Sequence, residues 1–334
     1  MMAILAGLGA AGCLSRPLVP TGPHALVADF KIHYVSARSG IREIFMMSLD
    51  GSGQTQLTRT PWPQLFAVGG PGEELVAFVA LHDGRKTISI MNVDGSSQRV
   101  ISPGGQDADT PRWSPDGSWI AYTGRIEGRG QLFVMDAHGR RTRQLIENEW
   151  DDENPRWSPD GRRIAFESDR DGQKGIYILS FGRGGVERVA AGLGNAWGPV
   201  WWPDAQGILF VSDRDGNNDI YSQGFDEPAA RNLTRHPADD SAPIFSPEGR
   251  RIAFVSDRTG TPDIFSMTKS GDQLINLTND PADDRDPVWL ANGQILFASD
   301  REHNWDLFLM NPDGSRAINL TLHPAPDGRS LFSN

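Results

Sequence analysis

The chain has 334 residues, 38% of them hydrophobic, with 37 glycines, 23 prolines and a net charge of −11. This acidic balance argues against nucleic acid as a partner, because no basic face can dominate the surface. The evenly spread glycines and prolines favour short strands joined by tight turns, and no stretch approaches the roughly 20 apolar residues of a membrane-spanning helix.

The N-terminus has the features of an export leader. A short apolar run from Ala3 ends in Leu8-Gly9-Ala10-Ala11-Gly12-Cys13, and small residues after an apolar run are typical of the end of a secretory signal. The order Ala-Ala-Gly-Cys resembles the lipobox of bacterial lipoproteins, whose cysteine is lipidated after cleavage. We therefore expect residues 1–23 to be a leader and linker, with Cys13 as the lipidation site. The expected location is the periplasm or the outer membrane of a bacterial cell envelope; the alternative is an irregular N-terminus with an isolated cysteine.

From residue 24 onward the sequence repeats with a period of 44 residues, shortened once to 43. The aromatic residue of the predicted second strand marks each repeat: Tyr34, Phe78, Tyr122, Phe166, Phe210, Phe254 and Phe297. A period in the forties made of strands and turns is the signature of a β-propeller with one blade per repeat. We predict an all-β fold over residues 24–334: a seven-bladed β-propeller of four-stranded antiparallel blades.

Each repeat predicts four strands. The innermost ends in an aromatic residue before a Ser-Pro-Asp-Gly type of turn, the second and third follow, and the fourth leads into Leu-Thr. The innermost aromatic residues are expected to be Trp113, Trp157, Trp202, Phe245 and Trp289.

The first repeat lacks an innermost strand, because it begins at Lys31–Ser36. The C-terminal segment Ser330-Leu331-Phe332 has the matching register, since Phe332 follows Trp289 by 43 residues. We expect this C-terminal strand to complete the first blade, which would close the ring and leave no unpaired sheet edge.

Two phrases of the repeat resemble a known family. WSPDGRRIAFESDRDG at 157–172 and FSPEGRRIAFVSDRTGTPDIF at 245–265, with the recurrent Asn-Leu-Thr, are similar to the TolB-like, WD40-like propeller repeats. TolB of the periplasmic Tol-Pal system carries an α/β domain before a six-bladed propeller. The resemblance implies membership of this repeat family, and the sequence departs from TolB itself in its seven repeats and in the lack of room for such an N-terminal domain.

Acidic residues recur in the links that enter the innermost strands, on the face where the loops between second and third strands also open. We call this the top face. The predicted mouth residues are Asp109, Asp152, Asn195, Asp240, Asp284 and Asp327. Facing carboxylates repel, so a cation such as Ca²⁺ or a basic partner group would offset them. The alternative is that each aspartate caps its own link through backbone N–H groups.

Other constellations are weaker. The Ser-Asp-Arg-Asp-Gly loops lack the glutamate of a calcium loop, which favours a structural role with arginine paired to a neighbouring aspartate. His82, His236, His303 and His323 fall near the top loops, and similar seven-bladed oligogalacturonate lyases hold a metal largely with histidines. His236 and His323, however, occupy equivalent His-Pro-Ala positions in two repeats. This equivalence favours inheritance with the repeat over histidines that converge on a metal. No nucleophile elbow, zinc motif or phosphate loop occurs.

The sequence therefore favours a non-enzymatic, exported, monomeric propeller with a binding or scaffold function. Its expected partner is a peptide, a protein or another cell-envelope component, held at the acidic top face and the central channel. The alternative is a metal-dependent polysaccharide lyase or hydrolase that acts at the same mouth.

Overall fold

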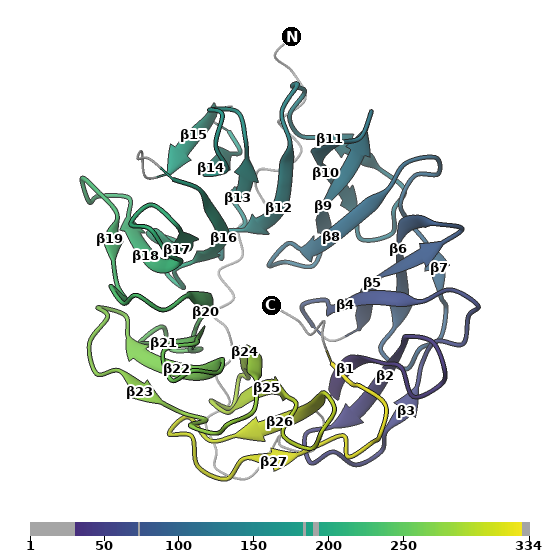
Figure 1. The fold of residues 1–334 in the computed structure, drawn as a ribbon. Helices are drawn as coiled ribbons and strands as arrows, with labels where there is room; N and C mark the ends of the chain where they lie inside the picture. The colour runs from purple at the N-terminus through teal and green to yellow at the C-terminus, as the bar shows by residue number, and fades with distance from the viewer. Residues whose placement is uncertain (1–30, 73, 183–184, 190–193, 329–334) are drawn as a thin grey trace.

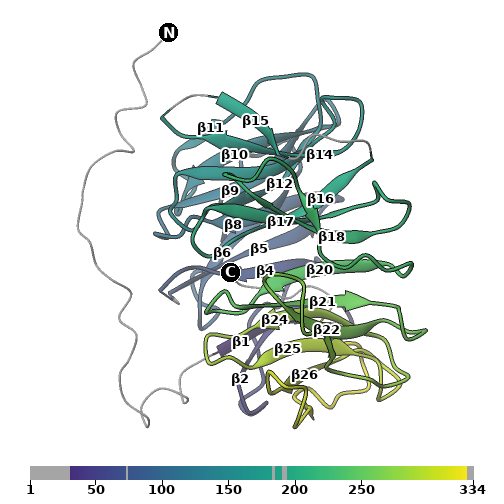
Figure 2. The same ribbon diagram turned by 90° about the vertical axis from the view of Figure 1, so that its left-hand side faces the viewer.

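The computed structural model describes residues 31–72, 74–182, 185–189 and 194–328, and every regular element in these ranges is a β-strand. The strands form seven antiparallel sheets around a central channel, the predicted seven-bladed propeller (Figure 1). Figure 2 shows the same sheets edge-on, side by side in one ring. Within the described ranges, no helix is long and apolar enough to cross a membrane. Cys13 lies outside the described residues.

The strands of each blade follow one another from the innermost outward. Blades 1 to 3 contain β1 (Lys31–Ser36), β2 (Glu43–Ser48) and β3 (Thr55–Gln56); β4 (Gln64–Gly69), β5 (Leu75–His82), β6 (Arg85–Asn92) and β7 (Arg99–Val100); β8 (Ala108–Trp113), β9 (Trp119–Ile126), β10 (Arg129–Asp136) and β11 (Thr142–Gln144). Blades 4 and 5 contain β12 (Asp152–Trp157), β13 (Arg163–Ser168), β14 (Gly175–Ser180) and β15 (Gly185–Val189); β16 (Ala196–Trp201), β17 (Gly207–Ser212), β18 (Asp219–Gly224) and β19 (Arg231–Asn232). Blades 6 and 7 contain β20 (Asp240–Phe245), β21 (Arg251–Ser256), β22 (Asp263–Thr268) and β23 (Ile275–Asn276); β24 (Asp284–Trp289), β25 (Ile295–Ser299), β26 (Asp306–Met310) and β27 (Ile318–Asn319).

The C-terminal segment pairs with blade 1, as predicted. Asp327 forms a bridge with Ser36 at the end of β1, and the Gly328 N–H donates to the Val35 carbonyl at 2.8 Å. In blades 4, 6 and 7 the same aspartate–serine pair begins the innermost strand, for example Asp284 with Ser299. The segment therefore enters blade 1 in the innermost position; residues 329–334, which carry the rest of the predicted strand, lie outside the described residues.

Within a blade, an aromatic pair packs the second strand against the third. These pairs are Tyr34–Phe45, Tyr122–Phe133, Phe166–Tyr177, Phe210–Tyr221, Phe254–Phe265 and Phe297–Phe308, with ring centroids 5.3–5.9 Å apart. Aromatic pairs add stabilisation beyond the apolar area that they bury. In blade 2, Phe78 faces Ser89 instead, the departure expected from the sequence.

The recurrent Asn-Leu-Thr closes the outer corner of blades 5, 6 and 7. In blade 6, Thr278 Oγ1 donates to Asp263 Oδ1 at 2.9 Å, and Asn276 Nδ2 donates to Asp263 Oδ2 at 2.8 Å. The Thr278 hydroxyl also accepts the Ile264 N–H. A buried carboxylate at the start of the third strand is thereby satisfied by the end of the fourth.

The prediction of the innermost aromatic residue is wrong by one position in blade 5. Trp201, not Trp202, ends β16, where it pairs with Ile208 as Trp157 pairs with Ile164. The Trp201 indole N–H donates to the Arg156 carbonyl at 3.0 Å, just as Trp157 donates to Arg112 at 3.2 Å. The indoles of Trp113, Trp157 and Trp201 therefore bind the preceding blade, whereas the Trp289 indole has no partner among the described residues. Trp202 lies beyond the strand, under the ammonium group of Lys269.

Candidate functional site

Four of the predicted mouth residues share one place in the fold. Asp152, Asp240 and Asp284 are the first residues of β12, β20 and β24, and Asp327 is their equivalent in blade 1. Their side chains are 0% exposed. Asp109 and Asn195 lie one residue away from this column, because Ala108 and Ala196 occupy it in blades 3 and 5.

Each of these four aspartates is neutralised within its own blade. Arg170 Nη2 donates to both carboxylate oxygens of Asp152 at 2.9 and 3.0 Å. In the pairs Arg258–Asp240 and Arg301–Asp284, one guanidinium nitrogen likewise donates to both carboxylate oxygens. Arg38 pairs with Asp327. These carboxylates therefore do not stand as unpaired like charges around the mouth, so the repulsion expected from the sequence is already offset by arginine.

The arginines come from the loops between the second and third strands, two residues after a serine. Arg258 Nε donates to Ser256 Oγ at 2.8 Å, and its guanidinium carbon lies 4.9 Å from the ring centre of Phe265. The sequence predicted such an arginine–aspartate pairing but as an exposed one. The pairs are buried instead, and a buried ion pair stabilises the fold only when its hydrogen bonds are complete.

Burial also favours the protonated form of three of these carboxyl groups. It raises the pKa of Asp240, Asp284 and Asp327 above the ordinary value of 3.8, although hydrogen bonds from serine and arginine oppose the rise. The cost of removing the carboxylates from water therefore exceeds what the arginines return, as is common for buried ion pairs.

A pH dependence of defined sign follows. The folded protein binds protons at these carboxyls before the unfolded chain does, so their contribution to stability is greatest below the unfolded pKa and is lost as pH rises through the raised folded pKa. We expect Asp284→Asn, which cannot titrate, to remove part of this downward slope in the free energy of unfolding, measured by urea denaturation between about pH 4 and pH 7.

Asp313 offers the matched control with the opposite sign. The Ser315 hydroxyl donates to Asp313 and lowers the pKa of that exposed carboxyl. Its contribution is present above the unfolded pKa and is lost as pH falls, so Asp313→Asn should change the slope in the other direction. Equal slopes for wild type and Asp284→Asn would contradict the expectation.

Three blades depart from the aspartate–arginine scheme. Blades 2 and 3 replace the long loop by two-residue turns with positive φ, Asp83-Gly84 (49° and 77°) and Glu127-Gly128 (50° and 83°), and so contain neither partner. Blade 5 keeps Arg214, over the Phe210 and Tyr221 rings, but has Ala196 where the aspartate would be. Within the described ranges Arg214 contacts no carboxylate at ion-pair distance.

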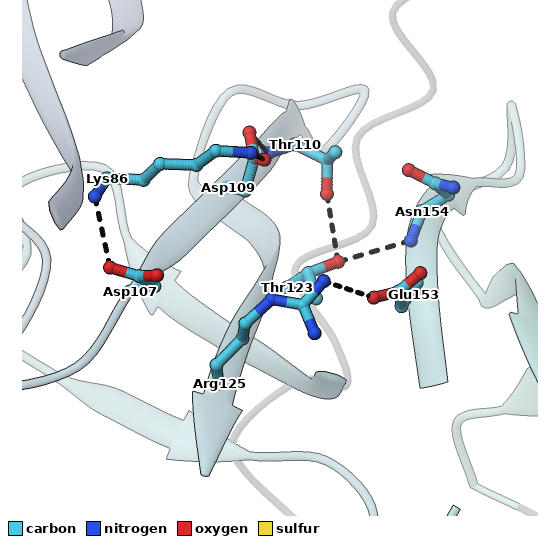
Figure 3. Close-up of a pocket in the computed structure, with 8 residues that line it drawn as sticks. All are labelled: Lys86, Asp107, Asp109, Thr110, Thr123, Arg125, Glu153 and Asn154. Carbon is cyan, nitrogen blue, oxygen red and sulfur yellow. Dashed lines mark hydrogen bonds and ion pairs between the residues drawn. The ribbon is translucent and has the colours of Figure 1, made fainter. Parts of the chain in front are cut away.

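A pocket of about 120 Å³ opens on the top face where blades 2, 3 and 4 meet (Figure 3). Two ion pairs border it: Lys86 Nζ with Asp109, and Arg125 Nη2 with Glu153 at 2.7 Å. All four side chains are between 24% and 45% exposed. Of the predicted mouth residues, Asp109 is the one with an accessible carboxylate at this pocket.

The floor of the pocket is made by bulges in the inner strands. Thr110 and Asn154 have positive φ values of 51° and 54° at the point where the register of β8 and β12 shifts. Thr123 Oγ1 bonds to the Thr110 hydroxyl at 2.9 Å and accepts the Asn154 N–H at 3.1 Å (Figure 3). A bulge turns its side chain away from the regular pleat, and bulges are frequent next to binding sites.

The histidines and the calcium-like loop are used locally. His236 Nδ1 accepts the Ala238 N–H at 3.1 Å, and His323 Nδ1 accepts the Ala325 N–H at 3.0 Å, so both cap equivalent turns. Asp215 accepts hydrogen bonds from Tyr221 and Asn232. In the described part of the chain, no three His, Cys, Asp or Glu residues are grouped to hold a metal ion.

The fold and the mouth define a seven-bladed β-propeller whose inner strands are tied to their loops by buried arginine–aspartate pairs. Residues 21–196, 152–238 and 230–331 match the TolB beta propeller domain. The chain belongs to this family. No curated protein matches the chain.

Solved structures show the same likeness. TolB from Acinetobacter baumannii is 24% identical with a TM-score of 0.58, covering 72% of this chain and 61% of that one. A putative TolB from Agrobacterium tumefaciens is 26% identical, TM-score 0.58, covering 71% of this chain and 88% of that one. An oligogalacturonate lyase in complex with manganese reaches a TM-score of 0.70 at 17% identity, covering 84% of this chain and 85% of that one. The likeness to the lyase is one of fold alone.

Proposed function

We propose that the protein is an exported, non-enzymatic binding propeller that engages a peptide, a protein or another cell-envelope component at its top face around the channel mouth. The observation that carries the proposal is the polar pocket between blades 2, 3 and 4. It combines accessible charges of both signs, Lys86–Asp109 and Arg125–Glu153, with the polar bulge residues Thr110 and Asn154.

The mouth residues divide into two roles in this proposal. Asp109 and its neighbour Glu153 contact the partner directly, since their carboxylates remain accessible. Asp152, Asp240, Asp284 and Asp327 shape the rim through their buried arginine pairs, and Asn195 bonds to Asp213 in the same rim. The protein acts as a monomer in the periplasm, or on the outer membrane through lipidation of Cys13, which metabolic labelling with a radioactive fatty acid would detect.

The test compares partner capture from a cell-envelope extract by wild type and by the double variant Asp109→Ala/Glu153→Ala. We expect the variant to lose the captured component while remaining folded, because exposed ion pairs contribute only about 0–1 kcal/mol each. Asp50→Ala/Asp313→Ala is the matched control: it removes two exposed carboxylates from hairpins on the opposite face and should retain capture.

Equal capture by wild type and the mouth variant would reject this site. Cleavage of acidic oligosaccharides by the purified protein, with or without Mn²⁺, would reject the non-enzymatic assignment.

A further inference from the structure

Two arginines interrupt an otherwise aliphatic position of the inner strands. The residue before the end of each inner strand is Val68, Val200, Ile244 or Val288 in blades 2, 5, 6 and 7, at the same strand register. In blades 3 and 4 the equivalents are Arg112 and Arg156, paired with Ala121 and Ala165. The propeller fold therefore does not require a charge at this position.

The two arginines lie on β8 and β12, neighbouring innermost strands that border the central channel (Figure 1). The Trp157 indole N–H donates to the Arg112 carbonyl at 3.2 Å and fixes the two strands to each other at this level. Both side chains retain part of their accessible surface. The strands run from the top links toward the Ser-Pro-Asp-Gly turns, so this level lies below the bulges and is separate from the pocket at the mouth.

Neither arginine has a carboxylate at ion-pair distance among the described residues, unlike Arg38, Arg170 and Arg258. Arg112 Nη1 donates only to the Pro111 carbonyl at 3.2 Å, and its guanidinium carbon lies 4.8 Å from the ring centre of Phe66. Its Nε is buried with no acceptor within the described ranges.

The carboxylates of Asp109 and Glu167 favour the charged forms of Arg112 and Arg156, respectively, but burial outweighs them. Burial lowers the pKa of both guanidinium groups, and the positive charge of Arg156 lowers the pKa of Arg112 further. Two like charges close to one another repel, and the unsatisfied buried Nε–H of Arg112 adds a desolvation cost. A bound anion would offset both costs.

We propose that Arg112 and Arg156 form a phosphate-binding site in the central channel, which takes inorganic phosphate or the phosphate group of an ester. Two guanidinium groups carry two positive charges, and a phosphate near neutral pH carries about −1.5 to −2. Planar guanidinium groups bind phosphate oxygens through paired hydrogen bonds, and a phosphate has more acceptor oxygens than a carboxylate to share between two arginines. The site does not depend on the partner proposed for the mouth.

The test is calorimetric titration of the purified full chain with inorganic phosphate, glucose 6-phosphate and, for comparison, acetate, at constant ionic strength. The variants are Arg112→Val, Arg156→Val and the double change, which introduce the residue that other blades carry. We expect each single change to weaken phosphate binding about tenfold or more, since hydrogen bonds to charged groups are strong, and the double change to abolish it. Tighter binding of the ester than of the free ion would identify an ester as the ligand, and equal or weaker binding would identify the free ion.

Arg140→Val/Arg141→Val is the matched control, because it removes two positive charges from an exposed hairpin and should leave binding intact. The double channel variant should unfold at an unchanged or higher temperature in phosphate-free buffer, and phosphate should stabilise only wild type and control. No phosphate binding by wild type, binding unchanged in the double variant, or acetate binding as tight as phosphate would overturn the site. Capture at the mouth depends on Asp109 and Glu153, so either proposal can fail alone.

Discussion

Arg258→Leu is expected to lower the free energy of unfolding by about 3–5 kcal/mol, because it leaves the Asp240 carboxylate buried without a counter-charge. Arg258 donates to both oxygens of Asp240 at 2.8 and 3.0 Å, and that carboxylate is 0% exposed. Urea denaturation followed by circular dichroism measures the loss. Part of it should be recovered as the pH falls, since protonation removes the buried charge.

Removing the aspartate instead of the arginine should lower the free energy of unfolding by less. In Asp240→Ala, Arg258 would keep its serine contact and its place over Phe265, and its side chain, 11% exposed, can reach water. Blade 5 already has this arrangement, with Arg214 facing Ala196. Ala196→Asp is therefore the reciprocal variant and should be tolerated. A loss for Asp240→Ala as large as for Arg258→Leu would contradict this asymmetry.

The blade architecture was predictable because it depends on spacing alone. The 44-residue column from Tyr34 to Phe297 is the register in which second strands pair with third strands, for example Phe254 with Phe265. The closure was predictable for the same reason, since the segment around Asp327 has the spacing of an inner strand. Where two tryptophans are adjacent, as at 201 and 202, spacing could not decide which one faces the preceding blade.

The chemistry of the mouth was harder to predict, because spacing locates a residue without saying what its side chain contacts. Asp240 and Asp284 were placed correctly at the starts of inner strands, but their burial depends on arginines that follow in the next loop. A partial signal was present: Ser-x-Arg loops occur in the four blades that carry the aspartate and in blade 5, which lacks it, and are missing from blades 2 and 3. Arg112 could also have been found, by comparison with Val200 and Val288 at the same repeat position.

Arg38→Leu is expected to be at least as damaging as Arg258→Leu, with a loss of about 3–5 kcal/mol, because the pair it breaks joins the two ends of the ring. Arg38 binds Asp327 across 289 positions of sequence. Asp327 Oδ1 is already buried with no partner among the described residues, so losing Arg38 would leave the carboxylate with little besides Ser36.

The location of the damage distinguishes closure from a general loss of stability. Ring closure holds β1 against the C-terminal segment through the Gly328–Val35 hydrogen bond, so Arg38→Leu should increase amide exchange in β1 and β2 more than in blades 4 to 6. Arg42→Leu changes an exposed arginine of the same loop and should leave exchange unchanged. Uniformly faster exchange across all blades in Arg38→Leu would show that this pair stabilises the propeller as a whole and has no special role in joining its ends.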